Sequence, residues 1–214
     1  MKPHLYVGSK RYSSWSLRPY LALVHAGELF DTTTILLDTP TSKAEIAAIN
    51  PAGLVPALHV DGAVIWDSLA ICEYVADRNP AARLWPEDPL LRAKARSISC
   101  EMHSGFAALR YSFPMQILET NVSSPTGEPK PQAFADVKRI EQIWREQLSG
   151  KRTGGPFLFG AFTIADAMFA PVASRFRTYG IDVDATCRAY IDAIFALPGV
   201  QQWMRDAESE PKSR

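Results

Sequence analysis

The chain has 214 residues, with 23 basic and 23 acidic side chains, a formal net charge of zero and a sequence pI of about 6.9. This length fits one large domain or two small ones, and a chain of this size buries about 70% of its unfolded surface without a disulfide or metal. The balanced charge excludes the electrostatic footprint of a protein that binds nucleic acid or an anionic membrane.

The N-terminal stretch and the cysteines indicate the compartment. The first residues, MKPHLYVGSKRYSS, lack the apolar core of a secretory signal. No apolar run approaches the roughly 20 residues of a membrane span. The cysteines, Cys72, Cys100 and Cys187, are odd in number and scattered, which disfavours a disulfide framework. We therefore expect a cytoplasmic protein without a membrane span.

Short strands and helices alternate in the first third of the chain. The strands are expected over residues 4–8, 32–37, 56–60 and 64–66, and the helices over 17–26, 43–49 and 68–77. The order is βαβαββα. The first two strands need a crossover and should be parallel, whereas the last two flank Asp61-Gly62, a hairpin signal, and should be antiparallel.

After Asn79 the pattern becomes helical. Prolines at 80, 86 and 89 punctuate a linker. Helices are expected over 90–120, with a break near Pro114, and over 132–149, 163–179 and 184–196. Thr163 and Asp166 have the spacing of a capping box, and Pro171 should kink the helix that follows or be tolerated in it. We expect a mixed α/β domain over 1–80, a linker over 81–89 and an all-helical domain over 90–214.

Three serines crowd the stretch 9-SKRYSSWSLRPYLAL-23, before the first expected helix. Ser16 best fits the helix N-cap, where a side-chain oxygen accepts a backbone N–H. Neither Ser13 nor Ser14 has a histidine or aspartate placed for a catalytic triad. A hydroxyl beside the free N–H groups of a helix start is better suited to stabilise a ligand thiolate and so lower the pKa of that thiol.

Two further stretches have both a structural and a ligand-binding interpretation. In 53-GLVPAL-58, Pro56 reads as an ordinary trans strand start, but a cis bond would turn the backbone of Val55 outward to pair with a peptide-like ligand. In 66-WDSLAICEYV-75, Asp67 or Ser68 caps a helix, and the same helix start can hold a carboxylate while the acid holds an ammonium group. Taken alone, each stretch favours the structural interpretation.

Taken together and in this order, these stretches resemble the cytosolic glutathione transferases over nearly the whole chain. The matching pieces are YSSWSLRP, NPAGLVPAL, WDSLAICEYV and FLFGAFTIADA. The resemblance implies a thioredoxin-like N-terminal domain, an all-helical glutathione-transferase C-terminal domain and a homodimer. It also implies glutathione as co-substrate, with no metal.

The resemblance implies roles residue by residue. The backbone of Val55, before a cis Pro56, would bind the cysteinyl backbone of glutathione, and Asp67 and Ser68 would hold its γ-glutamyl end. Lys43 is a candidate partner of the glycyl carboxylate, with a solvated lysine as the simpler interpretation. The thiol partner would be Ser13 by its spacing to an arginine, which is similar to the zeta and tau pattern Ser-x-x-x-x-Arg, or Ser14 if the loop is shifted by one residue.

The acceptor site is expected between the domains, against the first helix of the second. His103, Phe106, Arg110 and Phe113 recur along that helix at roughly helical spacing. An aromatic stripe is usually core, but a histidine and an arginine on the same face suit a polar or anionic substrate. We therefore expect a hydrophobic or partly anionic electrophile.

Three functions remain open at this point. The first is a serine-type transferase that activates the glutathione thiol for attack on an electrophile. The second is a glutathione-dependent cis-trans isomerase of the zeta, or maleylacetoacetate isomerase, kind. Trp15 stands where the zeta pattern has a cysteine, which weakens this assignment and disfavours a cysteine-based reductase. The third is a non-catalytic glutathione-binding scaffold.

Overall fold

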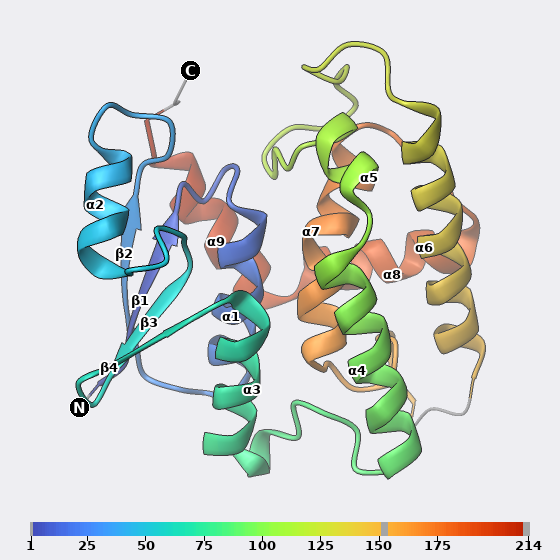
Figure 1. Ribbon diagram of the computed structural model, residues 1–214. Helices are drawn as coiled ribbons and strands as arrows, with labels where there is room; N and C mark the ends of the chain where they lie inside the picture. The colour runs from blue at the N-terminus through green and yellow to red at the C-terminus, as the bar shows by residue number, and fades with distance from the viewer. Residues whose placement is uncertain (1, 151–153, 212–214) are drawn as a thin grey trace. The chain divides into compact units, whose positions relative to one another are not determined.

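A four-stranded mixed sheet lies at the centre of the first part of the chain (Figure 1). The computed structural model describes residues 2–150 and 154–211, which divide into two units, Met1–Ala82 with Pro198–Arg214, and Arg83–Leu197. The elements of the first unit are β1 His4–Gly8, α1 Ser14–His25, β2 Asp31–Ile35, α2 Ser42–Ile49, β3 Ala57–Val60, β4 Ala63–Trp66, α3 Ser68–Arg78, the 3-10 turn η1 Pro80–Ala82 and α9 Pro198–Glu208.

The sheet has the expected βαβαββα topology. Its strand order is β2-β1-β3-β4, with β1 and β2 parallel and the other two pairs antiparallel. Asp61 and Gly62 both have positive φ, 49° and 82°, as a two-residue hairpin turn between twisted strands requires. Helices α1 and α3 lie side by side on one face of the sheet and α2 lies on the other (Figure 1).

Helix α1 begins three residues earlier than predicted. It starts at Ser14, with Ser13 as the N-cap residue, so Pro19 lies inside the helix and not in its first turn. The turn before it is closed by the Ser9 carbonyl, which accepts the backbone N–H groups of Tyr12 and Ser13 at 3.0 and 2.8 Å. This turn fixes the chain direction before Ser14, which is why the helix begins there.

The second unit is helical. Its helices are α4 Pro89–Ser104, α5 Ala107–Ser112, α6 Pro131–Ser149, α7 Ile164–Thr178 and α8 Ala185–Ala196. The predicted break near Pro114 is confirmed, because α5 ends at Ser112 and residues 115–120 are not helical, but the additional turn at Gly105 and Phe106 was not predicted. Phe106 adopts a left-handed φ of 57°, and a Cβ on Gly105 would lie 2.7 Å from the Glu101 carbonyl oxygen. A glycine is therefore required at the turn.

Helix α7 forms the core of the second unit, and nearly all of its side chains are buried. The predicted capping box is confirmed, since the Asp166 carboxylate accepts the Thr163 N–H at 2.8 Å. The same carboxylate accepts the Leu158 N–H and the Tyr190 hydroxyl, at 3.0 and 3.1 Å. Pro171 is tolerated within the continuous helix. Among the described residues, no helix is both long and apolar enough to cross a membrane.

Helix α9 was not predicted, and it changes the division of the chain. The sequence placed residues 90–214 in one helical domain, whereas the structure groups Pro198–Arg214 with the N-terminal sheet. The buried face of α9 consists of Val200, Trp203 and Ala207, and it packs beside α1 (Figure 1). The first unit thus contains both ends of the chain.

Candidate active site

Ser13 lies at the junction of β1 and α1. It occupies the N-cap position of α1, but its side chain makes no capping hydrogen bond. Instead its hydroxyl, in a residue only 6% exposed, donates to Oγ of Ser16 at 2.7 Å. The hydroxyl is therefore held in a side-chain hydrogen bond at the carboxyl end of β1 and is not used by the helix.

Ser16 was predicted to be the N-cap, and this prediction is wrong. It lies in the first turn of α1, completely buried, and its Oγ accepts the Gly8 N–H at 3.1 Å. Gly8, Ser16 and Ser13 thus form a chain of hydrogen bonds. A Cβ on Gly8 would lie 3.0 Å from Oγ of Ser13, so this chain of bonds depends on a glycine at position 8.

The other residues around Ser13, in the segment 9–18 that we call the serine loop, are also largely buried. Ser14 is the first residue of α1, and its N–H donates to the Tyr12 carbonyl at 2.9 Å. Arg18 is fully buried, with its guanidinium carbon 4.0 Å from the centroid of the Trp15 ring, a cation–π contact. Its charge lowers the pKa of the Cys72 thiol, but burial has the larger effect and raises it well above the ordinary value. Cys72 is therefore a core thiol.

The Val55–Pro56 peptide bond is cis, as the resemblance implied, and the trans interpretation is wrong. The preceding loop is organised by Asn50, which the sequence analysis missed. Its buried side-chain amide donates to the Leu54 carbonyl at 2.8 Å and its amide oxygen accepts the Ala52 N–H at 3.0 Å. Among the hydrogen bonds of the described residues, none uses the N–H or C=O of Val55.

Asp67 caps helix α3. Its Oδ1 accepts the N–H groups of Leu69 and Ala70 at 2.9 and 3.2 Å, which confirms the predicted cap. Ser68 is the first residue of the helix and is buried. Within the described part of the chain its hydroxyl has no hydrogen-bond partner. A buried hydroxyl at a helix N-terminus is suited to an anionic group, because the helix dipole favours negative charge there.

Lys43 is exposed in the first turn of α2. This position agrees with a solvated lysine and leaves its side chain free to reach an external carboxylate.

The four predicted acceptor-site residues all lie in the second unit, around the turn between α4 and α5. Phe106 and Phe113 are buried at the two ends of α5, and His103 is half-buried in the last turn of α4. Arg110 donates to the Gly105 carbonyl, and burial lowers its pKa against the opposing effect of the nearby Asp136 carboxylate. Arg110 thus also has a structural role, which the sequence did not indicate.

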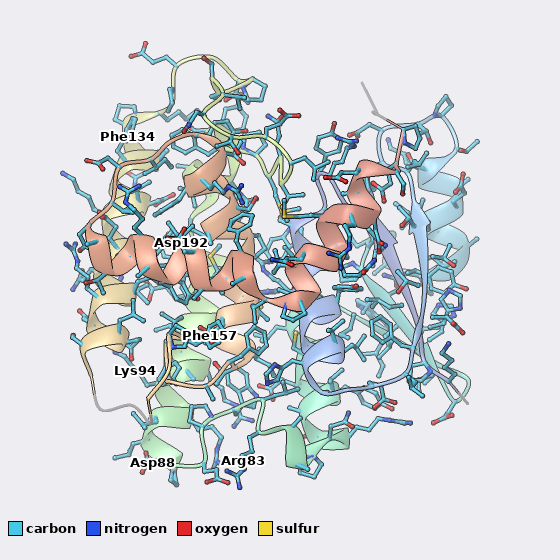
Figure 2. All side chains as sticks on the ribbon, turned by 180° about the vertical axis from the view of Figure 1, so that it is seen from behind. Arg83, Asp88, Lys94, Phe134, Phe157 and Asp192 are labelled. Carbon is cyan, nitrogen blue, oxygen red and sulfur yellow. The ribbon has the colours of Figure 1, made fainter. Side chains whose placement is uncertain are left out.

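Phe113 also lines a cavity of about 800 Å³ within the second unit. Its ring contacts those of Phe134 and Tyr179, with centroids 6.0 and 5.2 Å apart. Phe134 lies in the first turn of α6 (Figure 2), and both it and residues of the loop before α6 line the cavity. His103, Phe106 and Arg110 do not line it, so the four predicted residues do not share this cavity.

Comparisons with known proteins cover most of the chain. The family model for the glutathione S-transferase N-terminal domain matches residues 12–78, and that for the C-terminal domain matches residues 127–206. The probable maleylacetoacetate isomerase of Caenorhabditis elegans is 33% identical, over 85% of this chain and 82% of its own. The maleylacetoacetate isomerase of Rattus norvegicus is 30% identical over the same shares. A solved Burkholderia glutathione transferase homologue with bound glutathione has a TM-score of 0.74 and 25% identity, and the match covers 98% of this chain and 100% of that one.

Proposed function

Because this chain is an enzyme of the glutathione S-transferase family, we propose that its first unit binds glutathione and that the Ser13 hydroxyl activates the bound thiol for attack on an electrophilic small molecule. The observation that carries the proposal is the hydrogen-bond chain from Gly8 through Ser16 to Ser13, which ends in a hydroxyl at the carboxyl end of β1.

The first unit offers groups that fit each part of the tripeptide. The unpaired N–H and C=O of Val55 suit the cysteinyl backbone, which can pair with them as a short extra strand. The Ser68 hydroxyl, which has no partner in the described part of the chain, can turn to donate to the γ-glutamyl carboxylate. The exposed Asp67 would hold the ammonium group, and Lys43 the glycyl carboxylate.

The hydrogen bonds from Gly8 through Ser16 to Ser13 explain how the Ser13 hydroxyl becomes a donor to sulfur. Ser16 accepts the Gly8 N–H and still has its own proton to give. When the thiol binds and loses its proton to water, Ser16 donates to Ser13, and Ser13 turns its proton to the thiolate. A free thiol is only a few per cent ionised near neutral pH, and a hydrogen bond to the charged form lowers its pKa. The thiolate then forms a bond to the electrophilic carbon, and either a leaving group departs from that carbon with its electron pair, or the π bond of an activated alkene breaks and the resulting carbanion takes a proton from water.

The acceptor would be a hydrophobic or partly anionic electrophile. Phe106 and Phe113 supply apolar surface around α5, and His103 and Arg110 supply polar groups on the same segment. We further propose a cytoplasmic homodimer, which the family resemblance supports.

The test is a set of serine variants examined with glutathione alone and with an electrophile. For Ser13→Ala we expect the pKa of the bound thiol, followed by thiolate absorbance against pH, to rise toward its free value. We also expect kcat/KM to fall about 100-fold, the usual effect of removing one donor to a developing or stabilised anion. Ser14→Ala is the matched control. If the thiol pKa stays at the wild-type value in Ser13→Ala and rises in Ser14→Ala, the role belongs to Ser14. Wild-type values in both variants would reject serine activation.

A second candidate is glutathione-dependent cis-trans isomerisation. It is favoured by two relatives that are at least 30% identical over most of the chain, the probable maleylacetoacetate isomerase of Caenorhabditis elegans and the maleylacetoacetate isomerase of Rattus norvegicus. Isomerisation of maleylacetoacetate should then proceed with substoichiometric glutathione and without its net loss. Consumption of one glutathione per product would instead identify conjugation. Conjugation is also favoured by Trp15, which stands where the zeta pattern has a cysteine.

A further inference from the structure

Lys10 lies in the loop between β1 and Ser13, and residues near the C-terminal end of the chain hold it from several sides. Its backbone N–H donates to Oε2 of Glu210 at 2.7 Å, and its C=O accepts the indole N–H of Trp203 at 2.8 Å. Its ammonium group pairs with Asp206 at 2.6 Å. Lys10 is 8% exposed, so these bonds are largely shielded from water. All of these residues belong to the first unit.

Trp203, which holds the Lys10 carbonyl, is itself fixed against α1. Trp203 is fully buried, and its ring lies 4.9 Å from that of Tyr20, between centroids. At the other end of α9, a Cβ on Gly199 would lie 3.1 Å from Leu21, so the two helices approach closely there. Figure 1 shows α9 beside α1 along this contact. The C-terminal segment is therefore a fixed support for the loop.

The held loop is the one that sets the position of Ser13. Ser9, adjacent to Lys10, accepts the Ser13 N–H at 2.8 Å through its carbonyl. Its hydroxyl accepts the Leu37 N–H at 2.8 Å, which ties the same turn to the chain after β2. A change in the backbone at Lys10 would therefore be transmitted through Ser9 to Ser13.

We propose that Trp203 and Glu210 are positioning residues for the Ser13 hydroxyl, acting through the backbone of Lys10. The inference rests on the proposed role of Ser13. Burial of α9 needs only the apolar atoms of its buried face, whereas the Trp203 indole N–H and the Glu210 carboxylate satisfy both backbone groups of a single loop residue. Such a contact restricts the loop conformation, and a displacement of a catalytic group by about 1 Å can lower a rate about 100-fold.

The test uses Glu210→Ala and Trp203→Phe in the full-length enzyme. The first removes the acceptor of the Lys10 N–H, and the second removes the indole N–H while keeping an aromatic ring. Glu208→Ala is the matched control, because the Glu208 side chain is exposed and only its carbonyl contacts the loop, through Arg11. The readouts are kcat and KM against pH, the bound thiol pKa and the melting temperature.

For Glu210→Ala and Trp203→Phe we expect the thiol pKa to rise by about half a unit or more, since a poorly placed donor stabilises the thiolate less. We expect kcat to fall about 10-fold, with KM for glutathione within about two-fold, because Val55 and Ser68 are untouched. Glu208→Ala should match the wild type. A merely structural role would lower the melting temperature without moving the thiol pKa.

Two outcomes overturn the inference in distinguishable ways. If Ser13→Ala shifts the thiol pKa and a folded Glu210→Ala does not, the positioning role is rejected while the function of Ser13 stands. If Ser13→Ala leaves the thiol pKa unchanged, Ser13 does not activate the thiol and the positioning role fails with it. Because Glu210 is only half-buried, its variant keeps the test decisive even if Trp203→Phe fails to fold.

Discussion

Gly8 determines where the Ser13 hydroxyl lies. A Cβ at this position would meet the end of the Leu37 side chain at 2.9 Å and Oγ of Ser13 at 3.0 Å. The leucine can turn aside, but the serine oxygen is held at 2.7 Å by Ser16 and must shift. We expect Gly8→Ala to lower the free energy of unfolding by about 1 kcal/mol, typical of a small overpacking, while kcat/KM falls at least 10-fold. Denaturant unfolding and initial rates, both measured on wild type and Gly8→Ala, check this prediction. If kcat/KM falls no more than the fraction of folded protein does, the prediction is contradicted.

The residues near Gly8 also show what the sequence could and could not predict at this scale. Asp67 was recognisable as a cap because a capping acid makes only local hydrogen bonds, and the structure confirms it. Ser16 was misassigned because its partners, Gly8 and Ser13, are set by how the strand, loop and helix meet. Asn50 was missed although its partners, Ala52 and Leu54, are local and an asparagine before a proline was a signal for a structured loop.

At the scale of elements, periodicity and turn chemistry predicted the order of strands and helices in the first unit, the β1–β2 and β3–β4 pairings and most helices, but not the pairing of β1 with β3. The end of α5 near Pro114 was predictable because proline is the strongest local breaker, whereas the turn between α4 and α5 was missed because it depends on the close approach of Gly105 to Glu101 and on Arg110. Helix α9 was missed because its buried stripe is short and its other face is polar. Its assignment to the first unit depends on tertiary contacts with Lys10 and α1, which no local pattern encodes.

For the whole molecule the formal charges balance, so the pH dependence of the free energy of unfolding should come mainly from acids whose pKa is raised by burial. Among the described residues, burial raises the pKa of two carboxylic acids, the half-buried Glu210 in the first unit and the buried Asp166 in the second. Asp61 is exposed and Asp184 is partly exposed; the pKa of each is lowered, and solvent screening keeps their effect on stability small. The dominant titration should therefore be that of Asp166, whose pKa is raised from 3.8 to about 6.

The direction in which Asp166 changes the free energy of unfolding follows from which state, folded or unfolded, binds its proton more tightly. Because the pKa of Asp166 is higher in the folded state, its contribution is fully present below about pH 4 and is lost as the pH rises through about 6. The free energy of unfolding should fall by up to about 3 kcal/mol over this window. Asp166→Asn, which cannot ionise, should flatten that part of the profile and be less stable at every pH, since its NH₂ would face the Thr163 N–H. Glu210 remains in the variant, so a smaller slope from the first unit should persist. Denaturant unfolding of the wild type and of Asp166→Asn from pH 4 to 7 measures the two slopes. Parallel profiles for the wild type and the variant would contradict the prediction, because they would show that Asp166 stays ionised throughout.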